Sequence, residues 1–496
     1  MKKNFYITTA IDYVNGKPHI GHALEKIQAD VIARYQRQAG SDVFFLTGTD
    51  EHGVKIVRAA SAAKKTTTAF VNENTKAFKQ MAKTLDISND YFIRTSNKKV
   101  HWPSVRAVWK RLVKNRDIYK KRYSGLYCFG HEAFVTSKDL KKGICLLHGA
   151  SPEAVEEENY FFKLSKYTPK ILSAIKSGEL KIIPVSRQNE IIKLLTIGPG
   201  DVSFSRPRKD LKWGIPVPGD TTQTIYVWAD ALTNYISALG YATRKDSKFK
   251  KYWPADVQII GKDILRFHAA IWPAMLLSLK LPLPKTLFVH GFVSVGGQKM
   301  SKSLGNVIAP REIIEKYSAD ALRYYMLAEI HPTKDGDFSY EKFEARYDGE
   351  LALGLGNFFA RIAGLGERHI EKALAGNLAA QTEEELDRRT KNYKKAMEEF
   401  RFNDAIREVN ALISYGDRRI SAVKLWELAA HQDKSRFNEI MADITTLLAN
   451  VALLYAPIMP VTSAEIFKRL GVKASQKTTW RFTFNKGEPL FPRLGK

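Results

Sequence analysis

The chain has 496 residues, 44% of them hydrophobic, and its 78 Lys and Arg against 52 Asp and Glu give a formal net charge of +26. This length accommodates roughly two to four domains, and the lack of any run of about 18–20 apolar residues argues against a membrane span. The positive excess favours a polyanionic partner, because neutralising phosphates releases their counterions. Basic residues are spread along the chain, so we expect a large folded nucleic acid.

The N-terminal residues predict a β-α-β unit. Phe5–Thr9 is a short β-prone run, apolar residues at helical spacing follow from Gly21, and Gly40 ends this helix. The continuous apolar run Val43–Leu46 is typical of a buried parallel strand. Because the first strand begins almost at the N-terminus, we expect no signal peptide and a cytoplasmic location.

A second α/β unit appears much later in the chain. Val257–Ile260 and Leu287–Val289 predict strands, with a helix between them from Ile264 to Met275. Two α/β halves separated by a different kind of sequence indicate one Rossmann-type parallel sheet interrupted by an insertion. After about residue 345 the pattern becomes helical, and Thr462–Glu465 predicts the capping box of a late helix.

Two motifs indicate nucleotide chemistry. The first is Pro18–His22, where the first strand gives way to a helix: its N-terminus can face an anion, and His19 and His22 can donate to phosphate oxygens. The second is the glycine-hinged loop Gly296–Ser303, whose Lys299 and Lys302 can neutralise a triphosphate. Capping histidines or a solvated basic loop would explain either motif alone, but the two together in this order favour a nucleotide site.

At these residues the chain resembles the class I aminoacyl-tRNA synthetases, with Lys299–Ser303 a perfect KMSKS. The resemblance implies that ATP, with Mg²⁺, activates an amino acid to an aminoacyl-adenylate, which then acylates the 3′-terminal ribose of a tRNA at its 2′-OH. Catalysis would rest on positioning and electrostatics. The residues implied are His19, Gly21, His22, Lys299 and Lys302 for catalysis, Gly261 and Asp263 at the ribose, and His290 and Gly291 at the adenine.

Further segments are similar to the methionyl-tRNA synthetases in particular, over essentially the whole chain. They are Tyr13–Gly16, Leu46–Gly53, Tyr226–Tyr235, Phe267–His268 and Trp272–Met275. This similarity implies that methionine is the amino acid. Its pocket would consist of Ile11, Tyr13, Trp228, Ala231, Tyr235, Phe267 and His268, with Asp50 at the α-ammonium.

Aromatic rings suit a polarisable thioether, and Tyr235 and His268 can also offer weak hydrogen bonds to sulfur. One residue departs from the family pattern. Members often carry Pro-Ile-Tyr-Tyr where this chain has Ala10–Tyr13, so Asp12 places an additional carboxylate near the mouth of the pocket. The direction of its effect on methionine affinity stays open.

Two alternatives remain at this stage. A leucine-, isoleucine- or valine-specific relative would typically carry an editing insertion about twice as long as the one here. A non-catalytic tRNA-binding protein on a decayed synthetase scaffold would not need complete motifs. Methionine-dependent ATP–pyrophosphate exchange distinguishes all three.

The only two cysteines lie in a pair of short motifs, Cys128-x2-His131 and Cys145-x2-His148. Zinc accepts four tetrahedral Cys and His ligands, so this set is chemically sufficient. The surrounding segment resembles the connective peptide of the synthetases, whose zinc-binding members more usually have Cys where His131 stands. Bound Zn²⁺ and a metal-free knuckle held by hydrophobic neighbours both stay open.

The helical C-terminal third resembles the anticodon-binding bundle of the same family. Asn357 and Arg361 lie four residues apart, hence on one helix face, and Trp426 matches the anticodon-stacking tryptophan. We therefore expect tRNA(Met), initiator and elongator, as partner, with no membrane association. Since the chain ends soon after the bundle, we expect a monomer.

The predicted domains follow this order. They are the first half of the catalytic domain (1–115), a connective-peptide insertion (116–215), the second half (216–290), the KMSKS loop and stem-contact region (291–345), and the helical anticodon-binding domain (346–496). The predicted fold class is α/β, with an interrupted Rossmann-type parallel sheet followed by an α-helical bundle.

Overall fold

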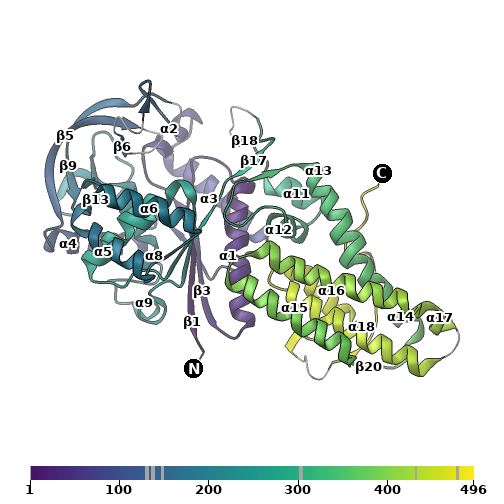
Figure 1. Ribbon diagram of the computed structural model, residues 1–496. Helices are drawn as coiled ribbons and strands as arrows, with labels where there is room; N and C mark the ends of the chain where they lie inside the picture. Colours follow the sequence, from purple (N-terminus) through teal and green to yellow (C-terminus); the bar gives the residue numbers. More distant parts are fainter. Residues whose placement is uncertain are drawn as a thin grey trace. The chain divides into compact units, whose positions relative to one another are not determined.

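The computed structural model describes residues 2–128, 133–135, 140–146, 150–300, 305–430, 433–475 and 480–495. The chain forms two compact units (Figure 1), of which the first contains Met1–Ala29, Gln36–Lys83 and Ile87–His290. The second unit contains Asp30–Tyr35, Thr84–Asp86 and Gly291–Lys496. Each unit is described by itself below.

A seven-stranded sheet lies at the centre of the first unit, with strand order β10-β16-β15-β1-β3-β2 and β4 also paired with β3. All these pairs are parallel, and Ile7 of β1 lies opposite both Val257 of β15 and Phe45 of β3. The two halves of the chain therefore meet at β1, which confirms the interrupted parallel sheet. The strands are β1 (Asn4–Thr9), β2 (Asp12–Tyr13), β3 (Asp42–Asp50), β4 (Tyr91–Arg94), β10 (Lys181–Ile183), β15 (Val257–Gly261) and β16 (Thr286–His290).

Helices of the first unit connect these strands. They are α1 (Ile20–Gln38), α2 (Val54–Ala62), α3 (Thr67–Thr84), α4 (His101–Lys114), α5 (Leu164–Ser177), α6 (Val185–Ile197), α7 (Val227–Leu232), α8 (Asn234–Ser237), α9 (Ser247–Tyr252) and α10 (Trp272–Leu279). The helix predicted from Ile264 to Met275 is not a uniform α-helix, because a 3₁₀ turn (Lys262–Ile264) and a π turn (Phe267–Ile271) precede α10. Pro273 has no N–H for the carbonyl four residues earlier, which favours this irregularity.

The interval 116–215 contains antiparallel β-structure as well as α5 and α6. Its main feature is a long pairing of β5 with β9, from Ile118 opposite Phe162 to Tyr127 opposite Glu153. The interval also supplies β10, which extends the parallel sheet by pairing with β16. The strands of this region and just beyond it are β5 (Ile118–Cys128), β6 (Ala133–Val135), β7 (Leu140–Lys141), β8 (Ile144–Cys145), β9 (Glu153–Phe162), β11 (Val202–Ser203), β12 (Ser205–Pro207), β13 (Pro216–Val217) and β14 (Asp220–Ile225).

The second unit is mainly helical, as predicted. Its helices are α11 (Pro310–Lys316), α12 (Ala319–Ala328), α13 (Tyr340–Arg346), a π segment (Tyr347–Gly356), α14 (Asn357–His369), α15 (Ala380–Glu398), α16 (Phe402–Ala422), α17 (Leu425–Ala430), α18 (Lys434–Tyr455) and α19 (Pro460–Arg469). Its short strands are β17 (Val293–Val295), β18 (Gln298–Lys299), β19 (Gly336–Phe338), β20 (Leu374–Ala375) and β21 (Arg481–Phe482).

The predicted capping box of the last helix is wrong. α19 begins at Pro460 and has no side-chain cap, so Thr462 lies inside the helix, where its N–H donates to Asp320 Oδ2 at 2.6 Å. Proline at the first helical position is pre-organised for a helix start, which explains why the helix begins earlier than the Ser/Thr signal suggested.

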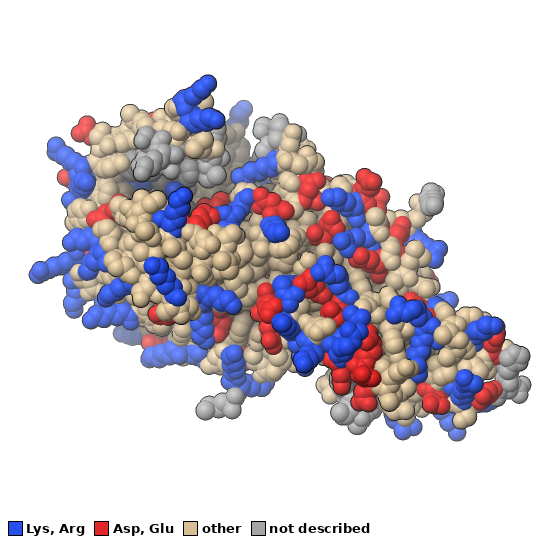
Figure 2. All heavy atoms as spheres, in the orientation of Figure 1, with Lys and Arg blue, Asp and Glu red and all other residues tan. Residues whose placement is uncertain are grey.

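One helix among the described residues, α18, is long and apolar enough to cross a membrane by length and composition. Of its most apolar window, 78% is buried inside the protein, as in a core helix of a soluble bundle. Figure 2 shows Lys and Arg side chains scattered across the visible face, with Asp and Glu among them. The surface thus carries the spread positive charge that the sequence predicted.

Candidate active site

The H-x-G-H motif, His19–His22, forms the N-terminal end of α1, which follows β2. The Gly21 N–H donates to Nδ1 of His19, and the His19 N–H donates to Nδ1 of His22, both at 3.1 Å. The ring centroids of the two histidines lie 3.9 Å apart. Because each Nδ1 accepts a hydrogen bond, the neutral imidazole carries its proton on Nε2.

His22 keeps its neutral form at physiological pH. Burial, with the positive charge of neighbouring groups including Lys26, holds the pKa of His22 well below its usual range. The two rings therefore offer Nε2–H donors of fixed orientation at the N-terminus of α1, where an anion is electrostatically favoured.

Aromatic side chains of the predicted methionine pocket converge in the same unit. Trp228 stacks on Phe267 with centroids 3.8 Å apart and an interplanar angle of 7°. Tyr235 and Phe267 are buried in the central hydrophobic cluster, and Ile11, Tyr13 and Trp228 pack against it while half-buried. Ala231 is buried on α7. The half-buried members leave apolar surface for a ligand.

His268 links the pocket wall to the π turn. Its Nδ1 lies 3.0 Å from the carbonyl oxygen of Ile264, which can only accept, so the proton is on Nδ1. Its Nε2, 2.7 Å from the Tyr235 hydroxyl, therefore accepts from that hydroxyl. Burial lowers the pKa of His268 to about 4, which is consistent with a neutral ring. The polar hydrogens of the Tyr235 hydroxyl and of His268 Nδ1 are therefore both used in hydrogen bonds to protein atoms. The wall of the predicted methionine pocket thus presents aromatic ring surface.

Asp50 lies at the carboxyl end of β3 and is 7% exposed. The Thr95 hydroxyl donates to its Oδ1 at 3.3 Å. The next residue, Glu51, is fully buried and accepts from Arg94, whose Nε is 2.7 Å from Oε1. This ion pair fixes the loop after β3, so that the Asp50 carboxylate is held at the edge of the sheet.

The predicted ribose and adenine residues meet where β15 and β16 end. Gly261 and His290 lie opposite each other in the register of these strands. A Cβ at Gly261 would lie 2.8 Å from Oδ1 of Asp263 and 3.7 Å from Cε1 of His290, so the three residues lie close together. The carboxyl edge of a parallel sheet, where two halves meet, is where such folds bind nucleotides.

A buried charge cluster, which sequence reasoning missed, adjoins these residues. Lys26 of α1 lies 2.9 Å from Oδ1 of Asp12 and 3.1 Å from Oε1 of Glu25. Oε2 of Glu25 lies 3.0 Å from Nε2 of His290. The signal in the sequence was a Glu-Lys pair inside the apolar stripe of the first helix, together with the unusual Asp12.

The KMSKS segment belongs to the second unit and is described only up to Met300. Lys299 is exposed on β18, with its ammonium 4.8 Å above the Phe292 ring. Gly296 and Gly297 have φ angles of 61° and 71°, so the turn between β17 and β18 requires glycine. Lys302 lies outside the described residues. Gly291 approaches the backbone of Lys334 so closely that a Cβ would lie 2.3 Å from its carbonyl.

The two cysteines lie in one small buried cluster with Val135, and each is 1% exposed. They do not form a disulfide. Two adjacent thiols fit the sulfur half of the predicted zinc ligands, whereas His131 and His148 lie outside the described residues. Within the part of the chain that the structure describes, no group of three or more His, Cys, Asp or Glu could hold a metal ion.

The predicted anticodon residues lie on the helical unit. Trp426 is 47% exposed, and the guanidinium of Arg361 lies 5.9 Å from its ring centroid. Arg361 is held by Asp417 at 2.9 Å, and Asn357, one turn earlier on α14, is exposed. An exposed indole with a fixed guanidinium beside it can stack on an unpaired base.

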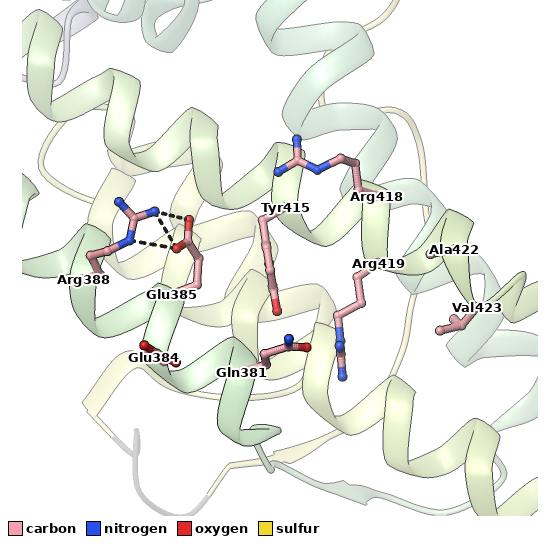
Figure 3. Close-up of a pocket in the computed structure, with 9 residues that line it drawn as sticks. All are labelled: Gln381, Glu384, Glu385, Arg388, Tyr415, Arg418, Arg419, Ala422 and Val423. Carbon is pink, nitrogen blue, oxygen red and sulfur yellow. Dashed lines mark hydrogen bonds and ion pairs between the residues drawn. The ribbon is translucent and has the colours of Figure 1, made fainter.

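A polar pocket of about 500 Å³ lies between α15 and α16 of the same unit (Figure 3). Arg388 makes a bidentate contact with Glu385 in its wall, and Arg419 pairs with the buried Asp443 at 2.6 Å. Carboxylates thus neutralise two of its three guanidinium groups, and none of the predicted anticodon residues lines it.

Two family models match the chain. A family model described as tRNA synthetases class I (M) matches residues 5–138 and 133–363. A second model, described as anticodon-binding domain of tRNA ligase, matches residues 382–486.

Relatives match over nearly the full chain. The methionine–tRNA ligase of Caldanaerobacter subterraneus subsp. tengcongensis is 41% identical over 510 residues, covering 100% of this chain and 79% of that protein. The enzyme of the same name from Brucella suis is 40% identical, and the match covers 96% of this chain and 93% of that protein. The Mycobacterium tuberculosis methionyl-tRNA synthetase in complex with methionyl-adenylate superimposes with a TM-score of 0.94 at 35% identity, covering 99% of this chain and 100% of that one.

Proposed function

Because this chain belongs to the methionyl-tRNA synthetases, a class I family, we propose that it activates L-methionine with ATP and transfers it to tRNA(Met). The observation that carries the proposal is that the H-x-G-H motif at the start of α1 and the stacked Trp228 and Phe267 belong to one unit, which is built on the parallel sheet. The enzyme is a methionine–tRNA ligase, and it supplies charged tRNA for both initiation and elongation.

In the first step a methionine carboxylate oxygen attacks the α-phosphorus of ATP, which enters as its Mg²⁺ complex, and pyrophosphate leaves. No side-chain nucleophile is required, so the protein contributes positioning and charge stabilisation. His19 and His22 donate hydrogen bonds from their Nε2–H groups to phosphate oxygens on which charge develops. Their Nδ1 atoms are held by the backbone N–H groups of Gly21 and His19, which supports this orientation.

Methionine lies against Trp228 and the other ring-lined residues, with its α-ammonium at Asp50. Sulfur–aromatic contacts, together with the apolar side chains of Ile11 and Ala231, suit a thioether better than an ionic or strongly polar side chain. The Tyr235–His268 hydrogen bond keeps both rings in place. The adenosine lies where β15 and β16 end, along Gly261, Asp263, His290 and Gly291.

Lys299, with Lys302 of the same loop, neutralises the departing pyrophosphate. The exposed position of Lys299 on a short glycine-turned hairpin supports a role in which the side chain moves to its ligand. In the second step the 2′-OH of the terminal ribose attacks the adenylate carbonyl, and AMP leaves. Asn357, Arg361 and Trp426 bind the anticodon.

The proposal also includes a bound zinc ion. Cys128, His131, Cys145 and His148 would hold Zn²⁺ as a tetrahedral structural site that stabilises the knuckle without entering the reaction. Metal analysis of protein purified without chelator tests this, since less than about a tenth of an equivalent would reject it in favour of a metal-free knuckle. The expected monomeric state, cytoplasmic location and absence of membrane association stay predictions.

Amino-acid-dependent ATP–pyrophosphate exchange tests the function. We expect exchange with methionine and at least about a hundredfold less with leucine, isoleucine or valine at equal concentration. Exchange with one of those three would instead assign the chain to that specificity. A protein with no exchange that still binds tRNA(Met) would be the non-catalytic alternative.

A further inference from the structure

The cluster around Lys26 connects two parts of the site that the proposed reaction uses separately. Lys26 is 2% exposed and donates to Ala10 O at 3.2 Å, to Asp12 Oδ1 at 2.9 Å and to Glu25 Oε1 at 3.1 Å. An ammonium group has three N–H donors. All three of them therefore have protein acceptors, and the charge is fixed in place away from solvent.

One side of this cluster faces the predicted methionine residues. Ala10 and Asp12 flank Ile11, and Asp12 directly precedes Tyr13 in β2. The link from β1 to β2 is short, and its backbone is held by the Ala10 N–H, which donates to Ile259 O at 2.9 Å, and by the pairing of β2 with β3. Two hydrogen bonds from one buried ammonium, to a carbonyl and to a carboxylate in this link, add to this pairing and fix the side of the link on which Asp12 lies, between Ile11 and Tyr13.

The other side faces the predicted nucleotide residues. Glu25 uses Oε1 for Lys26 and Oε2 for His290, whose ring lies within 4 Å of a Cβ placed at Gly261. Carboxylate oxygens accept, so the His290 Nε2 carries a proton and donates to Glu25. The ring orientation at the end of β16 thus depends on the carboxylate of Glu25.

The cation and the carboxylate support each other electrostatically. Burial alone would lower the pKa of Lys26, but Asp12 and Glu25 outweigh it and raise this pKa. Burial alone would raise the pKa of Glu25, but Lys26 and His290 lower it. Both groups are therefore charged at neutral pH, and loss of either one leaves its partner buried without compensation.

Resting on the proposed function, we infer that Lys26 is a positioning residue that holds the methionine side of the site through Ala10 and Asp12 and the adenine side through Glu25 and His290. Lys26 touches neither substrate. This assigns a role to Asp12, the residue that departs from the family pattern, as the acceptor that shares a buried lysine.

Two variants separate this role from simple stabilisation. Glu25→Gln keeps the size of the side chain but has one acceptor oxygen, so His290 or Lys26 loses its acceptor. If the amide oxygen faces Lys26, the amide N–H faces His290 and forces the other tautomer. We expect the KM for ATP in pyrophosphate exchange to rise about tenfold and the KM for methionine to stay within about twofold.

The double variant Asp12→Asn/Lys26→Met removes a carboxyl group and its ammonium partner, and leaves the buried Glu25 with His290 as its remaining partner, so we expect a lower Tm as well. The link between β1 and β2 loses its hydrogen bonds from Lys26, whereas Glu25 still accepts a hydrogen bond from His290. We expect the KM for methionine to rise about tenfold, with a smaller effect on the KM for ATP.

Lys166→Met is the matched control. Lys166 also pairs with a fully buried carboxylate of the first unit, Asp117, at 2.5 Å, but it belongs to α5 and to no part of the proposed site. It should lower the Tm and leave both KM values within about twofold.

The test is steady-state exchange with each substrate varied, alongside Tm. If Glu25→Gln and the double variant lower only the Tm, as the control does, the inference is wrong and the cluster is only stabilising. Wild-type protein without methionine-dependent exchange would reject the proposed function instead. Since Glu25→Gln is nearly isosteric, it tests the adenine half of the inference even where the double variant does not fold, and an unchanged KM for ATP in this variant alone would overturn the inference.

Discussion

Replacing Trp426 by alanine should separate tRNA charging from amino-acid activation. About half of this indole is in solvent, with 47% of it exposed, and the Arg361 guanidinium lies beside its ring. Stacking of one base on an aromatic side chain contributes about 1–3 kcal/mol. We therefore expect kcat/KM for tRNA(Met) to fall roughly 5- to 150-fold, because every 1.4 kcal/mol is about a factor of ten.

The stability cost of the same change should be moderate. Truncating a fully buried aromatic side chain costs about 3–5 kcal/mol. Since Trp426 is only about half-buried, we expect about 2 kcal/mol and a folded protein. Methionine-dependent pyrophosphate exchange, which needs no tRNA, should stay within about twofold of wild type.

Trp426→Phe is the matched variant, because it keeps a ring for stacking while removing part of the contact area. We expect it to retain most of the charging activity. Equal losses of charging and exchange in the alanine variant, or equal charging by the alanine and phenylalanine variants, would refute the assignment of Trp426 to base stacking.

Three further predictions follow from buried groups. Tyr235→Phe removes the hydroxyl that donates to His268 Nε2 at 2.7 Å, and should raise the KM for methionine roughly tenfold without changing that for ATP; an unchanged KM for methionine would place the pair outside the pocket. Arg323→Met leaves the fully buried Asp30 without one ion-pair partner and three backbone carbonyls without their donor, so urea unfolding should show a loss of about 3–5 kcal/mol, and a loss below about 1 kcal/mol would contradict this. Because the pKa of His268 is lowered to about 4 from 6.5, the unfolded chain binds a proton as pH falls from 6.5 towards 4 while the native state does not. Native stability should therefore fall by about 2 kcal/mol more between pH 6.5 and pH 5 than in His268→Gln, and parallel pH profiles of the two proteins would be the contrary result.

Sequence reasoning predicted the features that depend on long periodic patterns. The strand at Phe5–Thr9, the helix from Gly21 and the strands of the second half all occur close to their predicted positions, because long apolar stripes and runs must be buried. Short strands and irregular helical turns contain too few residues to show a hydrophobic periodicity from which they could be predicted. The three-residue strand β10 joins the parallel sheet from within the interval 116–215. The π turn at Phe267 is favoured by a nearby proline, and hydrophobic periodicity does not show how a proline changes the type of helix.

The site likewise contains residues that sequence motifs indicated and residues that they did not. The first motif was predicted to lie where a strand gives way to a helix, and His19–His22 do lie at the start of α1, shortly after β2. The motifs could not predict the Lys26 cluster, because its members come from three separate segments and pair only in the folded chain. They also could not show that the Tyr235 hydroxyl donates to His268, which depends on the tautomer set by Ile264.

The central claim is that this protein selects methionine and attaches it to tRNA(Met). The most direct test is a charging reaction with ATP, purified tRNA(Met) and all twenty amino acids at equal concentration, followed by mass spectrometry of the aminoacyl group released from the tRNA. Our account predicts methionine as the only amino acid recovered, in an ATP-dependent amount approaching one equivalent of tRNA. Recovery of leucine, isoleucine or valine, or no acylated tRNA at all, would contradict it.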